Sequence, residues 1–201
     1  MFLLGITGGV SSGKSLVANI LKDIGVYVIS ADDIVHRLLN DPYILSRIRE
    51  IFGNEVFEGE VLNRRKLAEI IFSDEKEREK LNHLIHPPVL SIMKEEIEKN
   101  KDIPIIACEV PLLFEVGIED WFDEIWVVYA PIEKQIERTI KKFNISYESA
   151  LKRVNSQIPI DEKVKRADYV IDNSGSIEDT KRQVMNRFCY IKRIVYNSKN
   201  R

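Results

Sequence analysis

The sequence is short of the features that mark secreted, membrane and nucleic-acid-binding proteins. It has two cysteines, Cys108 and Cys189, which form no metal-type pair, and this favours reduced thiols in a cytosol. No apolar run reaches the roughly 20 residues that a membrane span needs. Neither sign of charge is in large excess, since the net charge is −2, which argues against nucleic acid or an anionic membrane as a partner. We therefore expect a cytoplasmic protein.

Length and composition predict a globular protein with a sizeable core. The chain has 201 residues, of which 44% are hydrophobic and 31% are charged. This length is typical of one domain, or of one domain with an inserted subdomain. Residues 1–7 are apolar but lack a basic segment before them, so no secretory signal is expected.

Residues 8–15 have the pattern of a phosphate-binding loop. Their sequence is Gly8-Gly9-Val10-Ser11-Ser12-Gly13-Lys14-Ser15, which matches G-x-x-x-x-G-K-[ST] and follows the apolar run Phe2 to Thr7. The backbone N–H groups of such a loop surround the β-phosphate of a nucleotide, its lysine bridges β- and γ-phosphate oxygens, and its serine hydroxyl binds Mg²⁺. The next helix, about Lys14 to Leu21, directs its positive end at the anion. The predicted nucleotide contacts extend to Leu16.

Short apolar runs rich in β-branched residues predict five strands, at Phe2–Thr7, Val26–Ser30, Ile103–Cys108, Glu124–Tyr129 and Tyr169–Asp172. Their near-continuous apolar character is typical of parallel strands that are buried on both faces, and amphipathic stretches separate them. The predicted fold class is therefore α/β, a doubly wound and mostly parallel five-stranded sheet of the P-loop type. The last amphipathic stretch, Ile177 to about Tyr196, predicts one long helix.

Two long segments between the predicted strands are expected to form helical regions outside the sheet. The gap between the second and third strands is too long for one crossover helix, so residues 31–102 are expected to form a helical insertion. Residues 131–166 hold nine Lys or Arg against five Asp or Glu. That excess suits a lid over phosphates, although a solvated helix face has the same charge. The core would then be residues 1–30, 103–130 and 167–201.

Two carboxylates follow predicted strands, at the sheet edge where open α/β folds bind ligands. Asp32 comes directly after the second strand, where it could take a proton from an attacking hydroxyl or hold a Mg²⁺ water. A helix N-cap explains Asp32 equally well, unless Asp33 is the cap. Glu109 ends the third apolar run, as a Walker B carboxylate does, and is a candidate to bind Mg²⁺ directly or through water.

The cations of residues 131–166 are candidates to stabilise a transferring phosphoryl group when a lid closes. They are Arg138, Lys142, Arg153 and Lys163, and each alone is also explained as a surface charge.

The histidines give a weaker signal. His83 and His86 lie with Glu79 at helical spacing, but Pro87-Pro88 is expected to end that helix, and no further metal ligand is close in sequence. A structural or substrate-facing role is favoured over a metal site.

Several further segments together resemble one family, dephospho-coenzyme A kinase. Besides the loop they are Ala31-Asp32, Asn63 to Leu67, Leu81 to Pro87, Val110 to Glu115, Gln135 with Arg138, Gln157, and Ala167 to Gly175. They occur in the family's order over about residues 2–185. The resemblance implies ATP-dependent phosphorylation of the ribose 3′-hydroxyl of dephospho-CoA, giving CoA and ADP. It also implies a nucleotide-binding core, an acceptor-binding insertion and a lid.

The resemblance also implies roles for single residues. Asp32 would deprotonate the 3′-hydroxyl, and Lys14, Arg138 and Arg153 would be the other catalytic residues. The loop, Asn173 and Gly175 would bind ATP, and Ser15 would bind Mg²⁺ with Glu109. The residues expected to bind dephospho-CoA are Thr7, Asp32, Leu81, Asn82, His86, Leu112, Leu113, Phe114 and Glu115. A monomer or small homo-oligomer is expected, with no nucleic-acid or membrane partner.

Four positions depart from the family pattern. Ser11 replaces a usual glycine, Ser30 a common aspartate, Glu109 a frequent aspartate and Lys142 a common arginine. Because Ser30 supplies no carboxylate, Asp32 is the stronger candidate for the general base. Lys142 keeps the charge of an arginine but loses its bidentate fork.

The residues by themselves leave other functions open. A P-loop kinase for another small hydroxyl compound or nucleotide would share the loop and both carboxylates. A GTPase-type switch would need an Asn-Lys-x-Asp segment, and Asn100-Lys101-Asp102 has the wrong spacing. A catalytically dead binding protein is disfavoured because Lys14, Ser15 and Asp32 are all present.

Overall fold

The computed structural model describes residues 1–198, which divide into two compact units. The first unit is Met1–Ser30 with the chain from Ile97 onward, and the second is Ala31–Glu96. The second unit lies within the segment 31–102 that was predicted as an insertion. Of the core segment predicted for residues 167–201, residues 199–201 lie outside the described residues.

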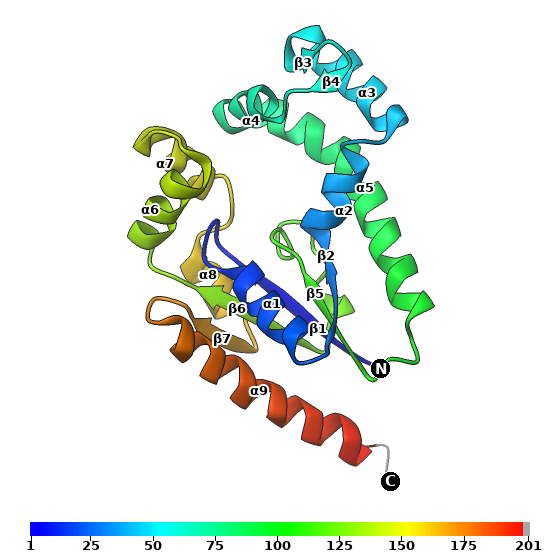
Figure 1. Ribbon diagram of the computed structural model, residues 1–201, viewed down its shortest axis with the longest axis vertical. Coiled ribbons are helices and arrows are strands. Elements are labelled where there is room, and N and C mark those ends of the chain that lie inside the picture. Colours follow the sequence, from blue (N-terminus) through cyan, green and yellow to red (C-terminus); the bar gives the residue numbers. More distant parts are fainter. Residues whose placement is uncertain (199–201) are drawn as a thin grey trace. The chain divides into compact units, whose positions relative to one another are not determined.

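The first unit is built on a wholly parallel five-stranded sheet with the order β2-β5-β1-β6-β7 (Figure 1). Its strands are β1 (Phe2–Gly8), β2 (Tyr27–Ser30), β5 (Ile105–Glu109), β6 (Glu124–Tyr129) and β7 (Tyr169–Asp172). All five predicted strands are present. The central strand is β1, whose Leu4 and Ile6 are fully buried, as expected for an apolar strand covered on both faces.

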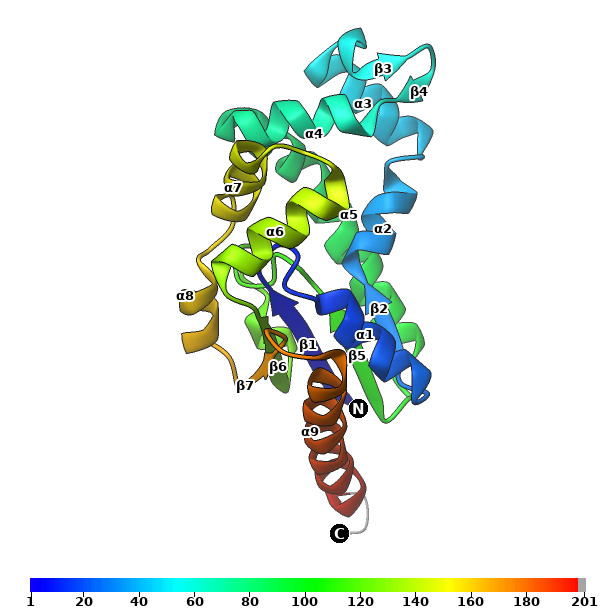
Figure 2. The ribbon, with the colours of Figure 1, turned by 60° about the vertical axis from the view of Figure 1, so that its left-hand side comes forward.

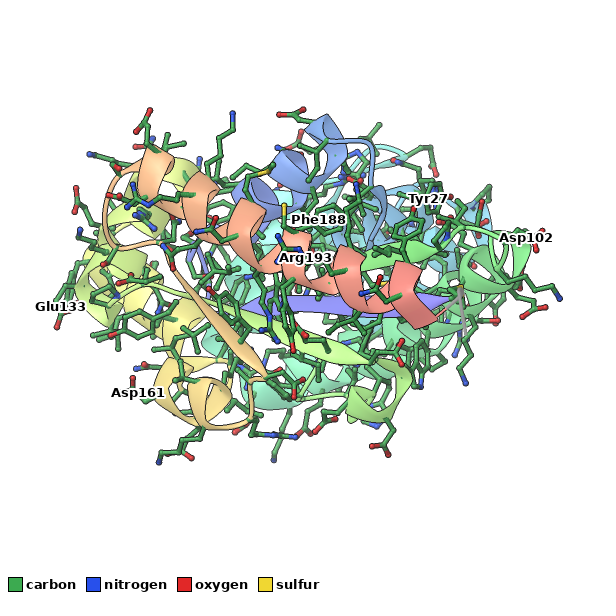
Figure 3. All side chains as sticks on the ribbon, turned by 90° about the horizontal axis from the view of Figure 1, so that it is seen from below. Tyr27, Asp102, Glu133, Asp161, Phe188 and Arg193 are labelled. Carbon is green, nitrogen blue, oxygen red and sulfur yellow. The ribbon has the colours of Figure 1, made fainter. Side chains whose placement is uncertain are left out.

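Helices cover both faces of this sheet, so the predicted doubly wound α/β fold is confirmed. Figure 3 shows α1 (Lys14–Asp23) and α9 (Ile177–Ser198) on one side of the sheet and α8 (Ile160–Lys165) on the other. The buried apolar residues of α9 are Val184, Phe188, Ile191 and Val195, which form one apolar stripe against the core. Among the described helices, none is long and apolar enough to cross a membrane.

The segment predicted as a lid is helical throughout most of its length. After β6, the chain forms α6 (Ile132–Phe143), α7 (Tyr147–Asn155) and then α8, and Figure 2 shows α6 beside α7. Ser146 caps α7, because its hydroxyl accepts a hydrogen bond from the N–H of Ser149. A 3₁₀ turn, η2 (Glu119–Trp121), lies between β5 and β6.

The second unit is mostly helical. It contains α2 (Ala31–Leu38), α3 (Pro42–Phe52), α4 (Arg64–Ser73) and most of α5 (Glu75–Lys99). A 3₁₀ turn, η1 (Asn54–Val56), leads into a hairpin of β3 (Phe57–Glu58) and β4 (Val61–Leu62). Sequence patterns missed this hairpin because two-residue strands are too short to show an alternation of apolar and polar residues.

The prediction that Pro87-Pro88 ends a helix is wrong, because α5 continues through both prolines to Lys99. A proline inside a helix removes one backbone hydrogen bond and crowds the preceding turn. Tertiary burial offsets that cost here. Ile85, Val89 and Met93 are buried at successive four-residue intervals, so one apolar stripe runs from before the prolines to beyond them.

Replacing Met93 by alanine tests the contribution of this stripe. Met93 is fully buried, so Met93→Ala is expected to lower the free energy of unfolding by about 2–5 kcal/mol, through lost burial and a residual cavity. Met93→Leu keeps the volume and is expected to cost less than about 1.5 kcal/mol. Urea unfolding followed by circular dichroism measures both, and equal losses would contradict the role given to the stripe.

Candidate active site

The predicted phosphate-binding loop joins β1 to α1 at the carboxyl edge of the sheet. Gly8, Ser11 and Gly13 have positive φ angles of 152°, 53° and 109°. Gly13 is the N-cap residue of α1 and is left-handed. The first backbone N–H groups of α1 have no carbonyl partner within their own helix, and the dipole of the helix adds positive charge at this end. The loop therefore has the form of an anion-binding site.

Ser11 occupies a left-handed position, which glycine adopts more readily than serine. Its hydroxyl oxygen is 2.9 Å from the Oγ1 of Thr139, to which it is hydrogen-bonded. Thr139 is fully buried on α6 and is also bonded to the carbonyl oxygen of Gln135, at 2.6 Å. The side chain at position 11 therefore ties the loop to α6, and no sequence pattern predicted a role for Thr139.

Two loop glycines are needed because neighbouring side chains occupy the space that a Cβ would take. A Cβ on Gly9 would lie 2.1 Å from Oε1 of Gln135, and one on Gly13 would lie 2.0 Å from Nδ2 of Asn173. Both amides are held by other hydrogen bonds, since Gln135 Nε2 donates to the carbonyl oxygen of Ala130 and Asn173 Oδ1 accepts from Thr180.

Arg138 and Asn173, two predicted site residues, meet at the loop. Nδ2 of Asn173 donates to the carbonyl oxygen of Ser12 at 2.7 Å, and the Arg138 guanidinium donates to the carbonyl oxygens of Ser12 and Asn173 at 3.3 and 2.8 Å. The Lys134 ammonium is bonded to the carbonyl oxygen of Ser174, which precedes Gly175. The turn after β7 is thereby fastened to the loop.

Lys14 and Ser15 are the loop residues that the motif predicts to contact phosphate and metal. Nζ of Lys14 donates to the carbonyl oxygens of Gly9 and Gly8, at 2.7 and 3.2 Å. The Ser15 hydroxyl donates to Oε1 of Glu109 at 2.7 Å. Mg²⁺ prefers one or two protein oxygens together with water and phosphate oxygens. A hydroxyl beside a carboxylate fits that preference, so these two residues could hold Mg²⁺.

The loop after β5 carries four predicted acceptor residues. Leu113 is fully buried, and a Cβ on Gly5 would lie 2.9 Å from its side chain, so Leu113 packs against β1. The Phe114 ring is stacked beneath the Arg166 guanidinium, 4.3 Å away. Leu112 is half-buried. Glu115 has one carboxylate oxygen, Oε2, that is buried and has no hydrogen-bond partner within the described chain.

Thr7 joins the same region to β1. It is fully buried, and its hydroxyl donates to the carbonyl oxygen of Pro111 at 3.2 Å.

The four candidate cations of residues 131–166 lie in different surroundings. Arg138 contacts the loop, as described above. The Arg153 guanidinium is buried and stacks on the Phe143 ring at 4.5 Å, whereas Lys142 is exposed. Lys163 is fully buried, and its Nζ is 2.8 Å from Oε1 of Glu115. Lys163 is therefore not the surface charge that its sequence context allowed.

The remaining predicted residues belong to the second unit. Asp32 is exposed in the first turn of α2, and no hydrogen bond or ion pair engages its carboxylate within the described chain. Since α2 begins at Ala31, both Asp32 and Asp33 are inside the helix, and the suggestion that either is its N-cap is wrong. Leu81 and Asn82 are half-buried on α5. Burial and the neighbouring His83 lower the pKa of His86.

The parallel sheet and the loop between β1 and α1 define a P-loop nucleotide-binding protein. The family model described as dephospho-CoA kinase matches residues 2–179. A dephospho-CoA kinase of Carboxydothermus hydrogenoformans is 39% identical over 187 residues, which cover 91% of this chain and 91% of that protein. The chain therefore belongs to the dephospho-CoA kinase family, and the family predicted from the sequence is confirmed.

Two solved structures are similar to this chain over most of its length. The crystal structure of TT1252 from Thermus thermophilus has a TM-score of 0.77 at 34% identity, covering 94% of this chain and 97% of that one. A dephospho-CoA kinase from Campylobacter jejuni has a TM-score of 0.62 at 27% identity, covering 94% of this chain and 96% of that one.

Comparing two glycines tests whether packing around the loop is needed for nucleotide binding. Gly13→Ala would place a Cβ against Asn173, so we expect ADP affinity to fall at least tenfold, which isothermal titration calorimetry measures. The matched control is Gly25→Ala. Gly25 also has a positive φ, of 85°, but nothing lies within 4 Å of its Cβ position. The Gly25→Ala variant should keep its ADP affinity, and its free energy of unfolding should fall by only about 1 kcal/mol. Equal ADP affinity in the two variants would contradict the expectation.

Proposed function

We propose that this protein transfers the γ-phosphoryl group of ATP to the ribose 3′-hydroxyl of dephospho-CoA and forms CoA and ADP. The observation that carries the proposal is a phosphate-binding loop in which Lys14 is bonded to the Gly9 carbonyl oxygen and Ser15 to Glu109, in a chain that belongs to the dephospho-CoA kinase family. In-line transfer needs little covalent chemistry from the protein, so catalysis comes mainly from positioning and charge stabilisation.

On the ATP side, each group has a distinct task. The backbone N–H groups of residues 8–15 and the first turn of α1, including Leu16, would hold the β-phosphate. Lys14 would exchange the carbonyl oxygens of Gly8 and Gly9 for β- and γ-phosphate oxygens. Mg²⁺ bound by Ser15 and Glu109 would neutralise phosphate charge. Asn173 and Gly175 would border the adenine.

On the acceptor side, Asp32 is proposed as the general base. Its carboxylate is exposed and unpartnered within the described chain, so it can accept the proton of the 3′-hydroxyl as the oxygen attacks the γ-phosphorus and the bond to ADP breaks. The bonds of Arg138 to the loop suit a cation that stabilises the developing charge. Arg153 is proposed to join it when the helical segment closes.

Dephospho-CoA would be recognised by the other predicted acceptor residues. The buried, unpartnered Oε2 of Glu115 is ready to accept a hydrogen bond from a substrate donor. Thr7, Leu112, Leu113, Phe114, Leu81, Asn82 and His86 complete the proposed acceptor set. We further propose a cytoplasmic enzyme, monomeric or a small homo-oligomer, that uses no nucleic-acid or membrane partner, in keeping with its net charge of −2.

A panel of acceptors tests the proposed function directly. Coupled ADP-release assays would offer dephospho-CoA, adenosine, AMP and shikimate in competition at saturating ATP and Mg²⁺. We expect kcat/KM to be at least 10³-fold higher for dephospho-CoA, because only this acceptor makes the full set of contacts. A preference for any other acceptor would replace the proposal with a P-loop kinase of different specificity.

Asp32→Asn tests the assignment of the base. This variant keeps the shape of the side chain but cannot take a proton, so kcat should fall about 10²–10⁴-fold while ATP affinity stays within threefold of the parent. Asp33→Asn changes the neighbouring carboxylate in the same helical turn and is expected to keep most of the activity. Steady-state kinetics at neutral pH measure kcat for both variants and for the parent. Full turnover by Asp32→Asn would show that another group is the base.

A further inference from the structure

Lys163 is fully buried, although lysine is among the residues least often found without solvent contact. It lies on α8, far along the chain from the phosphate-binding loop. None of the catalytic steps proposed above uses it. A buried ammonium needs compensating partners, so its contacts indicate what it does.

Three segments of the first unit meet at the Lys163 ammonium. Its Nζ is 2.8 Å from Oε1 of Glu115, 3.1 Å from the carbonyl oxygen of Pro111 and 3.5 Å from the carbonyl oxygen of Gly8. Oε1 of Glu115 also accepts a hydrogen bond from the N–H of Ile158, at 3.0 Å. The Lys163 ammonium therefore contacts the end of β1 and the segment 111–115 directly. Through Glu115, it is also connected to the chain that leads into α8.

The two carbonyl groups beside Lys163 belong to functional segments. The Gly8 oxygen is also 3.2 Å from Nζ of Lys14, the predicted phosphate-binding lysine. The Pro111 oxygen also accepts from Thr7 and directly precedes the four acceptor residues 112–115. A shift of this ammonium would move the loop that binds phosphate and the segment that carries acceptor contacts.

We propose that Lys163 is a positioning residue, whose buried ammonium fixes the phosphate-binding loop at Gly8 and the acceptor segment at Pro111 to a common point. When Lys14 leaves the Gly8 and Gly9 carbonyl oxygens to bind phosphate, Lys163 remains beside Gly8 as a cationic donor. The loop then keeps its shape as its own lysine moves.

A direct role on the transferring phosphoryl group is disfavoured by the same contacts. To reach a phosphate, Lys163 would leave the half-buried Glu115 carboxylate without its cationic partner, which is unfavourable. Burial lowers the pKa of Lys163, and Glu115 opposes that shift. The acceptor part of the inference rests on the proposed function, whereas its nucleotide part does not.

The test uses two variants and a matched control. Lys163→Met alone leaves the Glu115 carboxylate without its cationic partner and can prevent folding. The second variant therefore combines Lys163→Met with Glu115→Gln, which removes both charges together. The control is Lys165→Met on the same helix, where the side chain is exposed and forms an ion pair with Glu162. Melting temperature, ADP affinity by calorimetry, and kcat and KM for ATP and dephospho-CoA are measured for each.

We expect the double variant to stay folded, with a melting temperature within a few degrees of the parent, while its ADP affinity falls about tenfold. Its kcat/KM for dephospho-CoA should fall further, because both segments lose their common anchor. Lys165→Met should match the parent. ADP affinity is the decisive measurement, since a lost acceptor contact of Glu115 would not change it.

A folded double variant that binds ADP as tightly as the parent would overturn the inference and leave Lys163 a purely structural residue. Failure of the parent to phosphorylate dephospho-CoA would instead overturn the proposed function. In that event the ADP affinities would still report whether Lys163 positions the phosphate-binding loop.

Discussion

The left-handed turn at Gly13 is the constraint on which the rest of the site depends. Main-chain N–H groups cannot swing toward a ligand as side chains do, so a phosphate site built from them must be shaped from outside. Asn173 supplies that shape by filling the space where a Cβ would lie and by bonding the Ser12 carbonyl oxygen. Thr180 donates a hydrogen bond to Oδ1 of Asn173. The turn between β1 and α1 and the turn between β7 and α9 therefore form a single assembly.

Helix α6 belongs to this assembly through residues 135–139. Gln135 packs on Gly9, Arg138 binds the Ser12 carbonyl oxygen, and Thr139 binds Ser11. The later cations of the segment, Lys142 and Arg153, lie beyond these contacts along the chain. The N-terminal helix of this segment is therefore packed against the predicted phosphate-binding loop.

The sequence predicted elements well where one local signal dominated. Near-continuous apolar runs located all five strands. Prediction failed where distant packing outweighed a local preference. Pro87 and Pro88 discourage a helix, but the buried stripe of Ile85, Val89 and Met93 maintains one through them.

The sequence by itself determined the fold class, because strand burial acts over a few residues, and the family, because its motifs occur in order along most of the chain. Only the tertiary structure decided the surroundings of Lys163, Asn173 and Thr139. Helical spacing and charge do not distinguish a solvated lysine from a buried one. That distinction depends on which carbonyl and carboxylate oxygens the fold brings from distant segments, here Gly8, Pro111 and Glu115.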